Sequence, residues 1–444
     1  MARGKKKETL TPEERLQAAL VPESEQPYKV PANWCWVSLQ TIDQYQASSI
    51  DPSKYPDTLF ELYSVPSSAD NYPEIVLGCE IGSTKQSVQK GDVLLCKINP
   101  RINRVWKVSQ YTESALLASS EWIIIRNSKI VSDYLMHCFR APYFREYMLS
   151  NVSGVGGSLM RAQPKYVKTY PVPVPPLPEQ QRIVDRIESL FARLDEAKQK
   201  AQDALDSFET RKAAILHKAF TGELTSQWRK EHGVGMESWE KSRFDEVATI
   251  KSNLVNPLDF PDLPHIAPDN IEKKTGVLLE YHTVSEDGVT SGKHRFYPGQ
   301  ILYSKIRPYL SKVVVVNFNG LCSADMYPIE AKGNARCLWY YMLSEEFLEQ
   351  ASSAGSRSVL PKINQKELSA LTVVLPTLKD EQEEIVRILD DLFSKEQQAK
   401  EAAEGVLEQI DLIKKAILAR AFRGELGTND PTEESAVELL KTIM

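Results

Sequence analysis

Two long segments of the chain carry the same spacing of apolar residues. Counted in heptads from Ile183, nine of the ten a and d positions up to Ile215 are apolar, and the same frame moved by 202 residues again gives nine of ten. A spacing of 3.5 residues held over five heptads is typical of coiled-coil helices. We predict that the two helices pair through Ile183, Ile187, Leu190, Leu194, Phe208, Ile215, Ile385, Leu389, Leu392, Val406, Ile410 and Ile417.

Proline and glycine set the expected helix ends. The first helix should begin at Pro178, after a proline-rich run, and Gly222 and Gly424 should end the two helices. About 42 helical residues make a rod of roughly 60 Å. Connectivity allows parallel or antiparallel pairing, and antiparallel pairing would give a pseudo-twofold molecule. Alternatively, each helix belongs to a larger core or docks on another protein.

The chain is internally duplicated. Residues 179–224 align without a gap on residues 381–426, and 19 of the 46 pairs are identical, where roughly two or three are expected by chance. The regions before these segments repeat more loosely, as when Gly91–Pro100 matches Gly299–Pro308. The order is therefore variable module, fixed segment, variable module, fixed segment.

The repeat predicts the domain organisation. Each variable module mixes strand-like runs, such as Trp122–Ile125 and Val313–Val316, with short helical stretches, which favours an α+β fold. We expect an N-terminal extension (residues 1–32), a first module (33–174), a central helical spacer (175–228), a second module (229–374), a distal helical spacer (375–428) and a C-terminal tail (429–444).

Basic residues gather in windows of the modules that lack acids. No acid lies between Asp92 and Glu113 or between Asp287 and Asp325, and a second basic window follows a glycine- and serine-containing loop in each module. Such windows suit a polyanion backbone such as that of DNA, although a solvated basic face facing an acidic surface is the alternative. The candidate DNA-binding residues are Lys97, Arg101, Arg104, Lys107, Arg161, Lys165, Lys293, Arg295, Lys305, Arg307, Lys312, Arg357 and Lys362.

The two modules share some of these residues and differ in others. Shared residues, such as Lys97 and Lys305, are expected to contact phosphate or to support the fold, because phosphates carry no sequence information. Residues that differ are expected where two base sequences are read. The differing pairs are Asn99 with Arg307 and Arg101 with Tyr309.

Composition narrows the class of protein. The 444 residues suggest two to four domains, and 42% hydrophobic with 26% charged residues is ordinary for globular proteins. No run of about 18 apolar residues and no signal-peptide core occurs, so we expect a soluble, cytoplasmic protein with no membrane partner. The net charge of −6 gives no bulk indication of a nucleic-acid partner.

Motifs for catalysis and metal binding are not found in the sequence. The six cysteines form no C-x-x-C pair, the six histidines have no zinc-site spacing, and no phosphate-binding G-x-x-x-x-G-K-[ST] loop occurs. Asp262 followed by Glu272–Lys274 superficially matches a nuclease pattern, but the first module has no counterpart. We therefore predict no catalytic residue, no metal site and no cofactor in this chain.

Taken together, these features resemble the specificity subunits of type I restriction-modification systems. The resemblance rests on the doubled module-and-helix layout, on the Pro-Pro-Leu-Pro-Glu-Gln-Gln-Arg-Ile-Val start of the first helix and on Ala-Phe-x-Gly-Glu-Leu after each helix. It implies two α/β target recognition domains separated by two long antiparallel coiled-coil helices, in an α+β molecule with pseudo-twofold symmetry.

The resemblance also implies a function without catalysis. Each module would read one half of a split site in double-stranded DNA, and the helices would set the gap between the halves. Two modification (methyltransferase) subunits and the restriction (translocase) subunits would be partners, and these would use S-adenosylmethionine, magnesium and ATP. Two alternatives are a coiled-coil scaffold with protein-binding modules and a nuclease or methyltransferase with unrecognised motifs.

Overall fold

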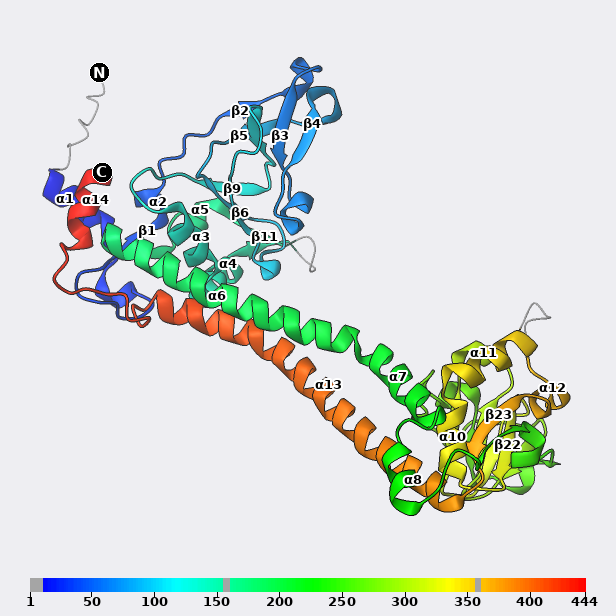
Figure 1. The fold of residues 1–444 in the computed structure, drawn as a ribbon. Helices are drawn as coiled ribbons and strands as arrows, with labels where there is room; N and C mark the ends of the chain where they lie inside the picture. Colours follow the sequence, from blue (N-terminus) through cyan, green and yellow to red (C-terminus); the bar gives the residue numbers. More distant parts are fainter. Residues whose placement is uncertain (1–10, 155–159, 356–360) are drawn as a thin grey trace. The chain divides into compact units, whose positions relative to one another are not determined.

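The computed structural model describes residues 11–154, 160–355 and 361–444. The chain divides into two compact units, one made of residues 1–200 and 406–444 and the other of residues 201–405 (Figure 1). Both boundaries fall inside long helices, so each unit contains a module together with parts of two helical segments.

The first unit begins and ends with short helices. Its elements are α1 (Pro12–Ala19), β1 (Cys35–Ser38), α2 (Leu39–Ile42), β2 (Ser49–Ile50), β3 (Leu59–Tyr63), β4 (Glu74–Leu77), β5 (Lys85–Ser87), β6 (Val93–Cys96), β7 (Val105–Lys107), β8 (Ala115–Ala118), β9 (Trp122–Ile125), α3 (Ser132–Arg140), α4 (Pro142–Ser150), β10 (Val152–Ser153), β11 (Arg161–Ala162), α5 (Pro164–Val167), β12 (Pro171–Val174), most of α6 (Leu177–Asp206), the end of α13 (Lys379–Ala421) and α14 (Ala436–Ile443).

The second unit contains the remaining elements. They are α7 (Phe208–Phe220), α8 (Ser226–His232), β13 (Trp239–Arg243), α9 (Phe244–Val247), β14 (Ala248–Ile250), β15 (Leu254–Val255), β16 (Pro264–Ile266), β17 (His282–Thr283), β18 (Lys293–Phe296), β19 (Ile301–Ser304), β20 (Val313–Val315), β21 (Gly320–Cys322), β22 (Met326–Ala331), α10 (Ala335–Met342), α11 (Glu345–Ala354), α12 (Gln365–Ser369), β23 (Thr372–Pro376) and the first part of α13.

The sheets of the two units correspond strand for strand. The five-stranded order β2-β5-β8-β3-β4 of the first unit matches β15-β18-β21-β16-β17 of the second, and each contains one parallel pair, β3 with β8 and β16 with β21. The order β7-β6-β9 likewise matches β20-β19-β22, to which the second unit adds β14. The duplication and the α+β class predicted from the sequence are therefore confirmed.

The first fixed segment is interrupted, unlike the single helix predicted. Helix α6 has 30 residues and α7 has 13, and Ser207 separates them. The Ser207 hydroxyl donates to the carbonyl of Ala204 over 3.1 Å, and the Arg211 guanidinium donates to the same carbonyl over 3.2 Å. Side chains that bond to a helix carbonyl weaken its main-chain bond and bend the helix. The second fixed segment, α13, is one helix of 43 residues.

The long helices pack together and run antiparallel within each unit. In the first unit, Lys414 of α13 pairs with Asp195 of α6 at 2.5 Å and lies 5.0 Å from the Phe191 ring centroid. In the second unit, Arg211 of α7 pairs with Glu396 of α13 at 2.8 Å. The first unit also has Arg182 donating to the carbonyl of Thr428, just after α13, and in the second unit Lys400 lies 5.3 Å from the Phe208 ring centroid. In both units a rising number on one segment therefore meets a falling number on the other, which is the antiparallel pairing that the family resemblance implies.

The predicted pairing residues are not equally buried. Ile183 and Ile187 are fully buried in the first unit, as are Ile385 and Leu389 in the second, and Ile410 is 3% exposed. Partly buried members are Leu190, Leu194, Phe208, Ile215, Leu392 and Ile417. Val406 is 40% exposed, so burial does not mark it as a pairing residue.

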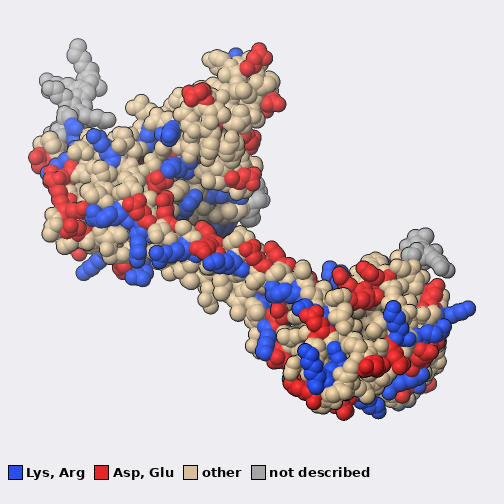
Figure 2. Space-filling view, in the orientation of Figure 1, with Lys and Arg blue, Asp and Glu red and all other residues tan. Residues whose placement is uncertain are grey.

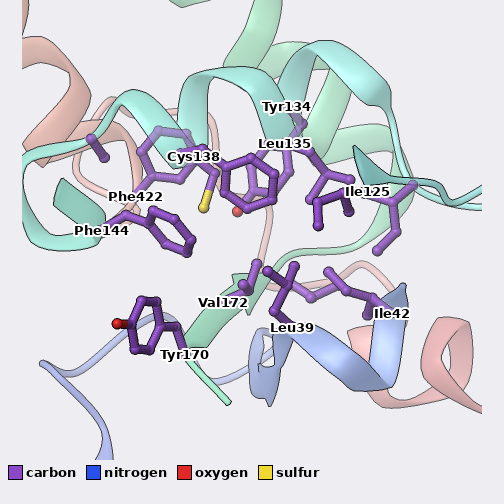
Figure 3. Packing of buried hydrophobic residues seen from close by; sticks show 14 of the residues in the cluster. Leu39, Ile42, Ile125, Tyr134, Leu135, Cys138, Phe144, Tyr170, Val172 and Phe422 are labelled. Carbon is purple, nitrogen blue, oxygen red and sulfur yellow. The ribbon is translucent and has the colours of Figure 1, made fainter. Parts of the chain in front are cut away.

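Both predicted helix ends are confirmed, and an aromatic residue explains the motif that follows each helix. Gly222 and Gly424 have φ of +79° and +75°, the left-handed conformation common at helix C-termini. Phe422 lies in the core of the first unit, 5.3 Å from the Tyr134 ring, among the side chains that Figure 3 shows. Phe220 lies against Tyr341 in the second unit in the same way, at 5.1 Å. The Ala-Phe-x-Gly segment therefore anchors a helix to a module core.

Candidate nucleic-acid interface

A tight turn follows β6 in the first unit, and it carries much of the first basic window. Lys97 directly follows the strand, and residues Pro100–Ile102 form a short 3-10 helix. Asn99 and Asn103, on either side of that helix, have φ of +46° and +52°. This left-handed region is rare for residues other than glycine, and asparagine tolerates it best. The turn therefore has a fixed, unusual backbone.

The second basic window lies directly beside this turn. The amide of Asn99 donates to the carbonyl of Met160 over 2.8 Å, and the amide of Ala162 donates to the carbonyl of Lys97 over 2.8 Å. Ile98 and Arg161 form an antiparallel bridge between these bonds. Two windows that lie about 60 residues apart in the sequence thus form one surface.

The second unit repeats this arrangement bond for bond. Arg307 donates its amide to the carbonyl of Pro361 over 2.7 Å, and Ile363 donates to Lys305 over 2.9 Å. Ile306 bridges Lys362. The turn residues Pro308–Leu310 again form a 3-10 helix, between Arg307 and Ser311 with φ of +48° and +45°. Arginine and serine have little intrinsic preference for this conformation, so the surrounding bonds impose it.

Beside each turn, an acidic residue forms an ion pair with a basic residue of the second window. Glu121 pairs with Arg161 at 3.4 Å, and Asp325 pairs with Lys362 at 3.5 Å. The four side chains are between 29% and 48% exposed, so these ion pairs are weak. Arg161 and Lys362 can therefore leave their acids and bind a phosphate instead. Glu121 and Asp325 lie 204 residues apart, at equivalent places in the two modules.

The shared lysines at the ends of β6 and β19 support the turns. The ammonium of Lys97 donates to the carbonyl of Ser120 over 2.7 Å, and that of Lys305 donates to the carbonyl of Ala324. The Lys305 side chain is only 15% exposed and lies 5.3 Å from the Tyr327 ring centroid. Burial and the neighbouring Lys362 lower the pKa of Lys305, while Asp325 raises it. Lys305 thus has little ammonium surface free for a ligand.

Several other predicted residues have partners inside their own unit. Lys107 pairs with Asp133 at 2.5 Å. Lys312 donates to the carbonyl of Pro268 over 2.6 Å, and its side chain is 15% exposed. Arg104 is half-buried. Burial raises the pKa of the neighbouring Cys96 thiol, and the positive charge of Arg104 lowers it by a smaller amount.

Two predicted residues lie on β18 of the five-stranded sheet, outside the turn. Lys293 is buried and donates to the carbonyl and hydroxyl of Ser291. The guanidinium of Arg295 lies 4.8 Å from the Phe260 ring and 5.3 Å from the Tyr297 ring. Their contacts are those of residues that support the sheet.

The most accessible predicted residues lie on the turns themselves and on α5. Arg101, Arg307 and Lys165 are exposed, as is Lys362 beside the second turn, and Tyr309, at the position of Arg101 in the second unit, is 47% exposed. The ammonium of Lys165 lies 4.7 Å from the Tyr166 ring centroid. Arg357 lies outside the residues that the structure describes. The accessible set is therefore smaller than the predicted set.

Charge on the visible face differs within the first unit. Figure 2 shows that the part formed by β3 and β4 is mostly uncharged, with some acids at its tip, whereas Lys and Arg side chains lie nearer the helices. A polyanion would be repelled by the tip and attracted by the basic part of the unit.

A Trp–Glu hydrogen bond, which the sequence did not predict, joins each module to its helix, and it is buried in the first unit and partly buried in the second. Trp34 donates to Glu179 over 2.7 Å, and Trp239 donates to Glu381 over 3.0 Å. Burial raises the pKa of Glu179, although its hydrogen bonds oppose that shift. The repeated Glu-Gln pair at the helix starts was the available signal. A carboxylate and an amide in a buried position need partners, and these partners come from the module.

Among the described residues, no group of three or more His, Cys, Asp or Glu side chains is arranged to hold a metal ion. Within the same part of the chain, no helix has both the length and the apolar character needed to cross a bilayer.

Comparison with known proteins defines the class. The family model for the type I restriction modification DNA specificity domain matches residues 79–205 and 236–405, more than half of the chain. The chain belongs to this family, and the resemblance found in the sequence is confirmed.

Individual relatives agree with this assignment. The specificity subunit of the type I restriction enzyme EcoDI from Escherichia coli is 41% identical over 276 residues, which are 57% of this chain and 62% of that subunit. The chain therefore aligns with about three fifths of that relative's length. The EcoKI specificity subunit from Escherichia coli strain K12 is 24% identical over 327 residues, 68% of each chain.

Solved structures show the same fold. The HsdS subunit from Thermoanaerobacter tengcongensis superposes with a TM-score of 0.66 at 22% identity, covering 91% of this chain and all of that one. A chain from work on complex assembly and conformational transition of the type I R-M system gives a TM-score of 0.69 at 22% identity, covering 90% of this chain and all of that one.

Proposed function

We propose that this chain is the DNA specificity subunit of a type I restriction-modification complex. Each unit reads one half of a bipartite site in double-stranded DNA, and the chain itself performs no catalysis. The complex acts in the cytoplasm, where the DNA is found. One observation carries the proposal: in each unit the two basic windows form a single turn-centred surface, held by equivalent backbone hydrogen bonds.

The chemistry of the two turns suits recognition of DNA. Exposed arginine and lysine side chains bind phosphates and set the position of the protein on the duplex. The turn residues differ between the units. The exposed Arg101 stands where the exposed Tyr309 stands, and the half-buried Asn99 stands where the exposed Arg307 stands. Arginine can donate two hydrogen bonds to guanine, whereas asparagine pairs best with adenine. The same backbone could therefore read a different sequence in each half-site.

The helices support a second part of the proposal. We infer that two modification subunits dock on the paired helices, and that restriction subunits complete the complex. Leu412 and Ile413, on the part of α13 that belongs to the first unit, are 64% and 42% exposed, and Val406 is 40% exposed. Apolar side chains gathered on an exposed helix suit a protein partner. S-adenosylmethionine, magnesium and ATP would be bound by those partners.

Salt-dependent DNA binding tests the proposal. The chain would be assembled with its modification subunits, and its affinity for duplex DNA would be measured between about 50 and 200 mM salt. Replacing Arg101 and Lys165 with alanine should weaken binding and reduce the salt slope by roughly one for each lost phosphate contact.

Lys241→Ala is the matched control. Lys241 is an exposed lysine on β13 and lies outside both turns, so its loss should leave affinity and slope close to those of the parent complex. Equal slopes in the parent, the double variant and the control would contradict the assignment of the turns to DNA binding.

A further inference from the structure

The second unit has a cavity that DNA reading does not use. Its volume is about 540 Å³, within the range of about 300–1,000 Å³ that is usual for small-molecule sites. Helices α7, α10 and α13 and the loop of residues 272–277 line it. All of these elements belong to the second unit.

Aromatic rings form one side of the cavity. Trp339 and Tyr340 of α10 meet Phe393 of α13, and the ring centroids of Tyr340 and Phe393 are 5.6 Å apart. The Tyr340 hydroxyl donates to Asp390 over 2.6 Å, and the Trp339 indole donates to the carbonyl of Val313 over 3.2 Å. These bonds fix the rings without a ligand, so the aromatic side is already formed.

The loop lies directly against the tryptophan. Gly276 has φ of +77°, and a Cβ atom there would be 2.4 Å from the Trp339 ring. A side chain at this position would push the loop off the ring. Gly276 therefore allows the loop of residues 272–277 to contact the Trp339 ring.

Lysines line the other side. Lys212, Lys273, Lys274 and Lys400 face two acids, Glu209 and Glu272, which leaves an excess of two positive charges. The Lys212 ammonium donates to the carbonyl of Lys274 over 2.7 Å and so connects α7 to the loop. Lys273 and Lys274 line the cavity and are exposed to solvent. These lysines belong to the Glu272–Lys274 run that superficially matched a nuclease pattern, and they surround a cavity with an excess of cations.

We propose that this cavity binds a nucleotide. Its planar base would lie against the aromatic side, and its phosphate would accept hydrogen bonds from the lysines of the other side, including Lys273 and Lys400. Aromatic rings stack on any base, and ammonium groups bind phosphate as point charges. The inference goes beyond the proposed function and does not depend on it.

Binding of adenosine monophosphate to the full-length chain tests the proposal. Titration calorimetry should show saturable binding of about one equivalent, with weaker binding of adenosine and of inorganic phosphate because each lacks one half of the contacts. A double variant, Lys273→Ala with Lys400→Ala, should lower the affinity for the nucleotide at least about tenfold, since charge-assisted hydrogen bonds contribute strongly. Lys241→Ala should not change it.

A second variant tests the proposal if the double variant does not fold. Trp339→Phe retains a ring but removes the indole that donates to Val313, and it should weaken binding of the nucleotide more than binding of inorganic phosphate. Absence of saturable nucleotide binding would overturn the proposal. Equal affinities for the nucleotide and inorganic phosphate would also overturn it, as would a parent-like nucleotide affinity in both variants. DNA binding by the assembled complex should be unchanged in the double variant, which separates this site from the turns.

Discussion

Asn99 and Arg307 hold the same left-handed backbone conformation in two turns with different side chains. Neighbouring backbone bonds impose that conformation in both units, so the side chain is free to vary. The lysines before these turns are less free, because Lys305 is largely buried and its ammonium is already bonded. At the scale of single residues, exposure therefore separates candidates for base reading from residues that support the turn.

His137 provides a test at this scale. Its ring is buried in α3, and burial, together with the nearby Arg140, lowers its pKa from 6.5 to about 4. In the unfolded chain it takes up a proton near pH 6.5, whereas in the folded chain it stays neutral. Stability should therefore fall as the pH drops from 6.5 towards 4, and this group should account for about 2 kcal/mol between pH 7 and pH 5.

Urea unfolding of the chain and of His137→Leu at the two pH values measures this contribution. The variant should lose about 2 kcal/mol less than the parent on acidification. His232→Leu, at an exposed histidine, should behave like the parent. An identical pH dependence in the parent and His137→Leu would rule out a neutral buried imidazole.

At the scale of elements, two glycines after α13 allow the cost of backbone strain to be measured apart from the cost of steric overlap. Gly424 and Gly427 have φ of +75° and +72°, but a Cβ atom at Gly424 would meet Pro31 at 2.4 Å, whereas one at Gly427 would meet nothing within 4 Å. Gly427→Ala should destabilise by about 1 kcal/mol through strain alone. Gly424→Ala should cost about 2–4 kcal/mol, because the helix end must also move away from the N-terminal segment. Thermal or urea unfolding compares the two, and equal losses would contradict the packing role.

The helices offer a second test at this scale. The ion pairs Lys414–Asp195 and Arg211–Glu396 set an antiparallel register inside the units. Extending the numbering of these pairs selects residues 197–203 and residues 404–410 as the two heptads to remove. Deleting both heptads should shorten the preferred gap between half-sites, by at most about three base pairs, since seven helical residues span about 10 Å. Mapping methylated sites of the assembled complex would show the gap, and an unchanged gap would mean that the helices do not set it.

The sequence predicted the helices and the repeat better than it predicted contacts between residues that are distant in the chain. Helix ends and the duplication leave local or repeated signals, and the structure confirms both. The heptads also leave a periodic signal, but Val406, one of the predicted pairing residues, is 40% exposed. The bridge between Ile98 and Arg161 leaves no such signal, because a pairing across 60 residues depends on how the module folds. The interruption at Ser207 was missed for a related reason: it arises from two side chains bonding to one carbonyl, which the apolar spacing does not reveal.

At the scale of the whole molecule, two units share strand order, helix docking and a basic turn, yet differ at the exposed turn positions. A duplicated scaffold with different contact residues suits recognition of a target whose halves differ. A scaffold that binds proteins through its modules would not need basic, acid-free turns at equivalent positions in both units.

The most direct test maps adenine methylation in cells that carry the parent chain or a variant with Arg307→Ala and Tyr309→Ala, together with the partner subunits. The parent should give a motif of two short half-sites separated by an unspecified gap. The variant should lose sequence preference in one half-site only, because the turn of the first unit is intact. A contiguous parent motif, or a variant motif altered in both halves, would contradict the claim that each unit reads one half of the target.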